Sequence, residues 1–284
     1  MNMMTSVTVV FVSYNSAAVL GEAIASVPSD VPVIVVDNAS EDNSGSVARE
    51  HGAHVIEAGA NLGFGTGCNI GARAATTDFV LFLNPDARLL PDSLDLLLAE
   101  TGTSPQAAAF GPVLLAHSGQ PELPRARTLL DTSGPAMMTT VPDEAVEVNF
   151  LSGACLLVRR QTFLDIDGFD EAIFLYLEDD DLCHRLAARG HGLRLVPAAR
   201  VVHHQGTSAP PSRAGLRLRN HHTMASHVYL ARKHGLEVDF EGMRKKARRR
   251  LLQARLTFDL DRIAINQGRL SGLAAEGPGK QSMA

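Results

Sequence analysis

The sequence predicts an α/β fold with a mostly parallel central sheet flanked by helices. Three apolar runs rich in β-branched or aromatic residues, at 7–12, 31–36 and 79–83, are too continuous for half-exposed strands and are typical of buried ones. Segments of helical character separate these runs, and this alternation predicts parallel strands joined by crossover helices. The carboxyl ends of such strands share one sheet edge, where ligands bind in open α/β sheets.

The remaining elements follow from caps, periodicity and turn residues. Ser16 can cap a helix, and Pro91 stands in a first helical turn, where its missing N–H costs nothing. Helices are expected at 16–27, 44–51, 65–75 and 91–100, and a short strand at 54–57. Prolines and weak periodicity predict an irregular connection over 117–149. Beyond it we expect an ordered apolar run at 150–158, a strand at 193–196, and helices at 178–189, 215–233 and 240–265.

The composition excludes several classes of protein. The 26 Lys and Arg residues against 31 Asp and Glu residues give a net charge of −5, so no global basic field indicates nucleic-acid binding. The 3 cysteines lack CxxC spacing, which argues against a disulfide framework or a zinc site. The longest apolar stretches fall below the roughly 18–20 residues that span a bilayer, and residues 1–6 lack a basic signal-peptide region. We therefore expect a cytoplasmic protein.

Polar residues follow directly after each predicted buried strand, and we expect them to converge at one edge of the sheet. They are Ser13, Tyr14, Asn15, Asp37, Asn38, Asn84 and Asp86. Asp37 is most simply an Asx turn or helix cap, and alternatively a hydrogen-bond acceptor for a base or ribose. Asp86 is either a turn acid after Pro85 or, together with a diphosphate, a ligand of a divalent cation.

The glycine-rich segment 61–71 is neither a dinucleotide-binding nor a Walker A motif. Counted from Gly65, the third glycine of GxGxxG would fall at position 70, which is Ile, and no Lys-Ser/Thr pair follows. These glycines favour close approach of the backbone, either to a ligand or to the sheet, and the segment alone does not decide between the two.

Consecutive acids at 178–181 open a predicted helix. Because like charges repel, at least one of them is expected to have a raised pKa or a cationic partner. The apolar stretch 174–177 would place the first acids beside a buried wall, which suits a general base. A solvated helix start is the alternative for Asp180 and Asp181. His203 and His204 follow a short strand and are candidate ligands of a metal or phosphate, although a lone histidine is most often structural.

A basic run at 244–250 has Met243, Ala247, Leu251 and Leu252 on roughly one helix face. A solvated basic helix is the default interpretation of this pattern. Contact with an anionic lipid surface or a polyanionic acceptor is the sharper one.

Taken together, an ordered series of motifs resembles the bacterial family 2 glycosyltransferases and, among them, the rhamnosyltransferase-like branch. The motifs are Val12-Ser-Tyr-Asn15, Val36-Asp-Asn-Ala-Ser40, Asn61-Leu-Gly-Phe-Gly65, Leu83-Asn-Pro-Asp86, Leu151-Ser-Gly-Ala154, Gly168-Phe-Asp-Glu171, Glu178-Asp-Asp-Asp-Leu182 and His203-x-x-Gly206-x-Ser208. The resemblance implies a GT-A fold in which residues 1–115 bind the nucleotide sugar and residues 116–212 bind the acceptor and hold the catalytic groups. A helical segment is expected at 213–270 and a disordered tail at 271–284.

The resemblance also implies site residues and a cofactor. Asp179 would be the catalytic base, with Glu178 the close alternative, and Asp86 with His203 would hold Mg²⁺ or Mn²⁺. Asn84 stands where the family's metal motif often has its first acid. Contacts with the nucleotide sugar are expected from Ser13, Tyr14, Asn15, Asp37, Asn38, Asn61, Gly63, Phe64, Gly65, Asn69, Asn84 and Asp86.

The implied activity is inverting transfer of a sugar, with rhamnose favoured, from a dTDP- or UDP-linked donor to a hydroxyl of a glycan, lipid-linked or natural-product acceptor. The alternatives are a nucleotidyltransferase that makes a nucleotide sugar, and a catalytically degenerate scaffold subunit. Residues 243–255 would allow peripheral contact with anionic membrane at the inner face of the plasma membrane. No nucleic-acid partner is expected, and the sequence leaves a homodimer open.

Overall fold

The computed structural model describes residues 7–126, 128–130, 137–204, 206 and 212–275. The chain forms two compact units, the first of residues 1–170 and 179–209 and the second of residues 171–178 and 210–284. None of the helices in these described ranges combines the length and the apolar character needed to cross a bilayer.

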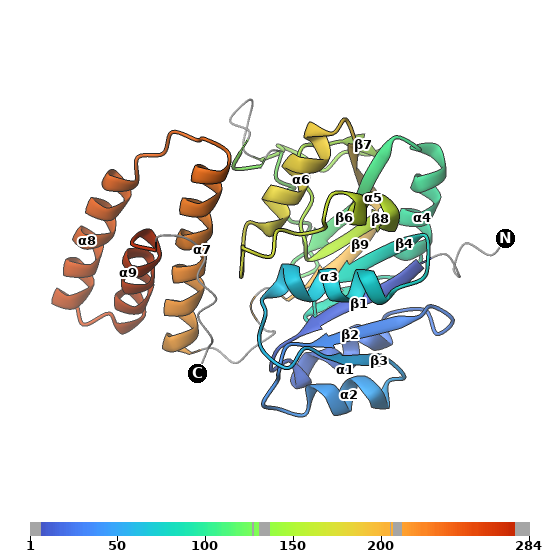
Figure 1. Ribbon diagram of the computed structural model, residues 1–284, viewed down its shortest axis with the longest axis horizontal. Helices are drawn as coiled ribbons and strands as arrows, with labels where there is room; N and C mark the ends of the chain where they lie inside the picture. Colours follow the sequence, from blue (N-terminus) through green and yellow to red (C-terminus); the bar gives the residue numbers. More distant parts are fainter. Residues whose placement is uncertain (1–6, 127, 131–136, 205, 207–211, 276–284) are drawn as a thin grey trace. The chain divides into compact units, whose positions relative to one another are not determined.

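The first unit is built on a mixed sheet that has nine strands within the described residues (Figure 1). Its strands are β1 (Val7–Ser13), β2 (Val33–Asp37), β3 (His54–Glu57), β4 (Phe79–Leu83), β5 (Ala87–Leu89), β6 (Ala107–Leu115), β7 (Val146–Glu147), β8 (Cys155–Arg159) and β9 (Gly192–His203). The spatial order is β3-β2-β1-β4-β8-β6-β9-β5, and β7 pairs with β9. Strands β1, β2, β3, β4, β6 and β9 run in one direction, and β5, β7 and β8 run against them. The predicted α/β class with a mostly parallel sheet is confirmed.

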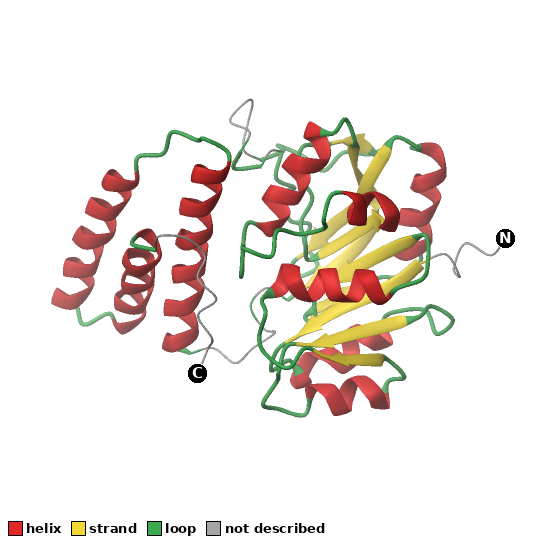
Figure 2. Cartoon of the chain, in the orientation of Figure 1, coloured by secondary structure: helices red, strands yellow, loops and turns green. Residues whose placement is uncertain are grey.

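Helices cover both faces of this sheet (Figure 2). They are α1 (Ala17–Ala25), α2 (Ser44–Glu50), α3 (Phe64–Ala74), α4 (Ser93–Thr103), α5 (Arg160–Asp165) and α6 (Glu178–Ala188). Alternate residues of β1 point to opposite faces, as strand geometry requires. Val10 and Val12 join a core with residues of α3, α5 and α6, whereas Val9 and Phe11 join a second core with residues of α1, α2 and α4.

Helix α3 approaches β1 unusually closely. A Cβ atom on Gly67 would lie 2.6 Å from Cγ1 of Val12, and one on Gly71 would lie 2.3 Å from Cγ1 of Val10. Of the two interpretations of the glycine-rich segment, tight packing against the sheet therefore accounts for Gly67 and Gly71.

The second unit contains α7 (Arg213–Lys233), α8 (Phe240–Leu256) and α9 (Leu260–Leu273). Helix α9 packs main chain to main chain on α7, because Cβ atoms on Gly268 and Gly272 would lie 2.1 Å and 2.2 Å from the carbonyl oxygens of Arg217 and His221. His222 of α7 is buried and stacks on Phe174 with a ring-centroid distance of 4.4 Å.

The predictions miss three strands, helix α5 and one helix break. Strands β5, β6 and β7 were not predicted. For β6 the reason is its composition, because its alanines, Gly111 and Pro112 have weak strand preference. The single helix predicted at 240–265 is wrong, since the chain turns between α8 and α9. Helix α9 runs to Leu273, into the predicted tail, whereas residues 276–284 lie outside the described part of the chain.

The close contact of Gly71 with β1 predicts that a larger side chain at this position destabilises the protein. Gly71→Ala forces a methyl group into Val10, and overpacking of this kind lowers the free energy of unfolding by about 1–3 kcal/mol. Gly102→Ala in α4 is the matched control, because a Cβ there meets no atom within 4 Å; that change should be neutral or stabilising by about 0.4–1 kcal/mol. Urea denaturation measures both variants. Equal stability of the two would contradict the packing argument.

Candidate active site

The predicted polar clusters lie at the carboxyl edge of the parallel strands. Parallel pairing sets Ser13 at the end of β1 opposite Asp37 at the end of β2, and the Asn38 N–H donates to the Ser13 carbonyl at 2.8 Å. Strand β4 runs parallel to β1 on its other side, so the Asn84–Asp86 turn follows at the same edge.

The loops after β1 and β2 are tied together by side chains. Asn15, which has a left-handed φ of 53°, donates its N–H to Ser40 Oγ at 3.0 Å and accepts the Glu41 N–H through Oδ1 at 2.7 Å. Oδ1 of buried Asp37 accepts the Ser40 N–H at 3.0 Å. Asn15 and one oxygen of Asp37 therefore build these turns, which is the structural alternative raised for Asp37.

Two polar side-chain atoms at this edge are buried without a hydrogen-bond partner among the described residues. They are Oγ of Ser13 and Oδ1 of Asn38. The amide nitrogen of Asn38 donates to the carbonyl of Gly63 at 3.0 Å and so fixes the start of α3. Gly63 has a φ of 88°, a conformation that favours glycine, and Asn61 Oδ1 accepts its N–H at 3.2 Å.

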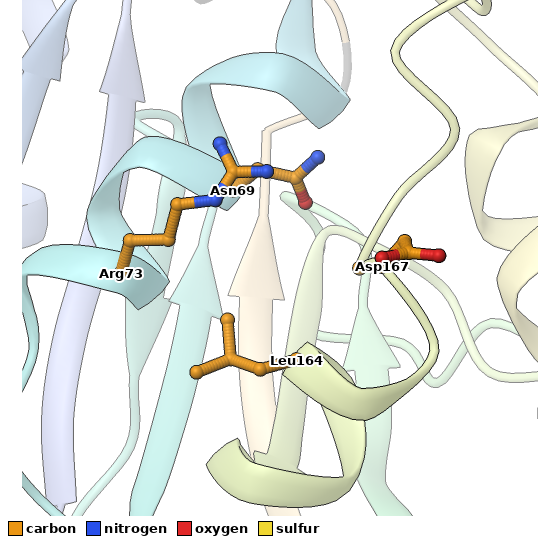
Figure 3. Close-up of a pocket in the computed structure, with 5 residues that line it drawn as sticks. Asn69, Arg73, Leu164 and Asp167 are labelled. Atoms are coloured by element: carbon orange, nitrogen blue, oxygen red, sulfur yellow. The ribbon is translucent and has the colours of Figure 1, made fainter.

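Asn69 has a structural use. Its amide donates to the Phe169 carbonyl at 2.9 Å and accepts the Phe169 N–H at 2.8 Å, so both of its groups hold the turn after α5. A hollow of about 240 Å³ lies beside this contact, lined by Asn69, Arg73, Leu164, Asp167 and Gly168. Figure 3 labels the first four of these residues. None of the strand-end carboxylates lines that hollow, so it is separate from the edge described above.

A second group of side chains forms where the turn after β4 meets β9. Nε2 of His203 lies 3.4 Å from Oδ1 of Asp86 and 3.4 Å from Nδ2 of Asn84. Antiparallel pairing of β5 with β9, which sets Ala87 opposite His203, produces this contact. His204 points elsewhere, with its Nδ1 2.8 Å from Nδ1 of His117. Within the described ranges no cluster of three or more His, Cys, Asp or Glu residues suited to a metal occurs.

The acids of α6 have distinct surroundings. Asp180 is fully buried and forms two hydrogen bonds with the guanidinium of Arg125, at 3.0 and 2.7 Å. Asp181 is also fully buried and pairs with Arg185 at 2.6 Å. The solvated alternative for these two residues is therefore wrong, because burial makes them depend on arginine partners.

Asp179 differs from both neighbours because it is partly exposed. Its Oδ2 accepts the Gly153 N–H at 3.1 Å, and its Oδ1 accepts the Asp180 N–H at 3.0 Å. Burial and the charge of Asp180 raise the pKa of Asp179 to about 6, against the lowering influence of Gly153 and Arg125. Glu178, the alternative base, is 7% exposed. The site thus holds a carboxylate that is reachable and unusually basic.

Sequence reasoning missed two residues that shape this carboxylate. Arg125 comes from the irregular connection, and the run of acids implied that a cation was needed without indicating which one. Gly153 belongs to one of the quoted motifs, but its role was not assigned. A Cβ on Gly153 would lie 3.4 Å from Cε1 of Phe64 and 3.8 Å from Oδ2 of Asp179, so this glycine brings α3 and the base together. Ser208 lies outside the described residues.

Comparisons with known proteins agree with this fold. A sequence model of glycosyl transferase family 2 matches residues 8–166. N-acetylglucosaminyl-diphospho-decaprenol L-rhamnosyltransferase of Mycobacterium tuberculosis is 33% identical over 234 residues, covering 72% of this chain and 76% of that protein. Rhamnosyltransferase WbbL of Escherichia coli K12 is 30% identical over 192 residues, covering 61% of this chain and 72% of that protein.

Solved structures share the architecture. S. aureus TarS 1–349 aligns with a TM-score of 0.57 at 16% identity, over 94% of this chain and 91% of that one. GalNAc-T7 with UDP, GalNAc and Mn²⁺ aligns with a TM-score of 0.60 at 15% identity, over 81% of this chain and 48% of that one. The protein has the GT-A fold of nucleotide-sugar transferases. It belongs to glycosyl transferase family 2, in the rhamnosyltransferase-like branch, and this membership favours an active transferase over a nucleotidyltransferase or an inert scaffold.

The surroundings of Asp179 predict an unusual titration. One carboxyl group should lose its proton near pH 6, being neutral below and charged above, because burial opposes the charge. Asp179→Asn should remove that step, and Asp30→Asn, a change at an exposed position, should leave it in place. Carbon-13 NMR of labelled carboxyl groups measures the titration. Persistence of the step in Asp179→Asn would assign it to another acid.

Proposed function

We propose that this enzyme is an inverting transferase that moves rhamnose from a dTDP- or UDP-linked donor to a hydroxyl of a lipid-linked acceptor. The names of the relatives support the sugar and the acceptor, since one is an L-rhamnosyltransferase acting on N-acetylglucosaminyl-diphospho-decaprenol. A soluble glycan or natural-product acceptor is the second candidate. A cytoplasmic location completes the proposal.

The environment of Asp179 supports its proposed role as the general base. A general base must reach the proton it removes and must bind that proton well, and Asp179 is partly exposed with a pKa raised to about 6. The N–H groups of Gly153 and Asp180 orient its carboxylate. In the proposed reaction, Asp179 takes the proton of the acceptor hydroxyl as that oxygen attacks the anomeric carbon from the face opposite the diphosphate. One base suffices, because inversion in a single displacement forms no covalent sugar–enzyme intermediate.

The donor side of the proposal uses the carboxyl edge of the sheet. Asp37 would bind the base or ribose. The segment from Asn61 to Gly65, which leads into α3, would border the diphosphate, since helix N-termini favour anions. Ser13 and Asn38 each have a buried polar atom without a protein partner at this edge. Tyr14, Phe64 and Asn84 complete the predicted donor set, which Asn15 and Asn69 support through the turns they hold.

A divalent metal fits the group formed by Asp86 and His203. One carboxylate oxygen and one imidazole nitrogen lie 3.4 Å apart, and Mg²⁺ or Mn²⁺ needs few protein ligands when diphosphate oxygens and water complete its shell. Such a cation would neutralise negative charge developing on the leaving diphosphate. Asn84, 3.4 Å from His203, would contribute no charge to this group.

Two variants distinguish between the candidate bases Asp179 and Glu178. Asp179→Asn should lower kcat by about 100-fold or more, since a positioned general base contributes on that scale, and should leave donor affinity nearly unchanged. Glu178→Gln, at a buried neighbouring position, should retain most of the activity. Steady-state transfer rates and calorimetric donor binding provide the two readouts. Wild-type turnover in Asp179→Asn would remove this residue from the mechanism.

The donor and metal assignments are tested by calorimetry. Titration with dTDP, UDP and GDP, each with and without Mn²⁺, should give metal-dependent binding of one nucleotide. Asp86→Ala should abolish that dependence, because the variant lacks the carboxylate that would hold the cation. Mn²⁺-dependent affinity that survives in Asp86→Ala would place the cation elsewhere. Absence of binding by the folded wild-type protein to all three nucleotides would count against the donor proposal.

A further inference from the structure

The corner between α8 and α9 exposes large apolar side chains. Leu252, Leu256, Phe258 and Leu260 are 60%, 74%, 84% and 50% exposed. They fall within nine consecutive positions of one helix–turn–helix corner. Scattered apolar residues on a surface are ordinary, but a contiguous group of this kind marks an interaction site.

Packing within the three-helix unit does not require these side chains. Helix α8 buries Ala247 and Ala254, which form its inward face. Leu252 and Leu256 belong to a different face, which they share at helical spacing with exposed Lys245 and Arg249. The sequence interpretation placed Leu252 on roughly one face with Ala247, whereas in the structure Ala247 is buried and Leu252 is exposed.

The backbone at the corner makes Phe258 more informative. The Asp259 N–H donates to the Ala254 carbonyl at 2.9 Å and the Phe258 N–H to the Arg255 carbonyl at 3.3 Å, which is the Schellman pattern of a helix end. Phe258 occupies its left-handed position with a φ of 54°. Glycine is preferred there, because a side chain in this conformation is strained. An exposed phenyl ring at a strained position indicates a use outside the folded unit.

The charge around the corner is strongly positive. Helix α8 carries seven Lys or Arg residues and one Glu, whereas the whole chain has a net charge of −5. The acids beside Phe258 are already paired. Asp259 lies 3.3 Å from Nε of Arg262, and Asp261 lies 3.0 Å from Nε of Arg213. An anionic partner would therefore meet an excess of positive charge around an apolar tip.

We propose that this corner is a membrane-docking tip, defined by Leu252, Leu256, Phe258 and Leu260. Its apolar side chains enter the acyl boundary of an anionic bilayer, while the Arg and Lys residues of α8 bind lipid phosphates. Basic residues flanking exposed apolar ones match such a surface in both charge and polarity. Compared with the contact at 243–255 predicted from the sequence, this tip extends the apolar surface from the end of α8 through the turn to the start of α9.

The chain contains no Trp, so one introduced indole reports on its own surroundings. Phe258→Trp should show a blue shift of its emission when vesicles of phosphatidylglycerol and phosphatidylcholine in equal amounts are added. Vesicles of phosphatidylcholine alone should give a weaker shift, because the electrostatic attraction is missing. Val238→Trp is the matched control, since Val238 is 38% exposed in the connection between α7 and α8.

Vesicle flotation tests the same tip without a probe. Phe258→Ser should weaken binding to the anionic vesicles by about tenfold or more, whereas Val238→Ser should leave it unchanged. Far-UV circular dichroism checks that the variants fold. Equal shifts for both Trp variants, or unchanged flotation of Phe258→Ser, would overturn the proposal. So would a wild-type dimer that Phe258→Ser dissociates, because the tip would then bind a second copy. These measurements need neither donor nor acceptor, so their failure would leave the sugar-transfer proposal untouched.

Discussion

Two fully buried carboxylates at the start of α6 are the constraint on which the catalytic half depends. Asp180 and Asp181 each require a cation, because a buried charge without one costs about 3–5 kcal/mol. Arg125 reaches Asp180 from the irregular connection, and Arg185 joins Asp181 to carbonyls of the turn after α5. Asn69 of α3 holds the same turn. The acidic cluster and Asn69 together therefore join α6 to the irregular connection, the turn after α5 and α3.

This arrangement separates the roles of adjacent, chemically similar residues. Asp180 and Asp181 are buried in ion pairs with arginines. Asp179 accepts hydrogen bonds from backbone N–H groups and is partly exposed to solvent. Burial raises the pKa of Asp179 above that of an ordinary aspartate, the charge of Asp180 raises it further, and Arg125 opposes both effects. The basicity of the candidate base thus depends first on its burial and then on an ion pair to which it does not itself belong.

The sequence predicted those parts of the molecule that depend on local pattern. Continuous apolar runs predicted β1, β2 and β4, and the polar residues after them marked Asp37 and Asp86 as candidate site residues. Strand β6 was not predicted, because its alanines, Gly111 and Pro112 have weak strand preference and form a strand through pairing with β8 and β9. The partners of Asp180 and Asn69 lie 55 and 100 residues away, and pairings at that distance leave no mark on local periodicity. The candidate base Asp179 could be singled out from the sequence, but the residues that shift its pKa could not.

The contact of α9 with α7 has a mechanical consequence. Gly268 and Gly272 let the two backbones touch, so no layer of adjustable side chains lies between them at these points. Helices in direct backbone contact cannot shift against each other by changing side-chain rotamers, so we expect α7 and α9 to move as one rigid pair. A displacement of the start of α9, at Leu260, should therefore move α7 as well, because side-chain repacking between the two helices cannot compensate for it at these points.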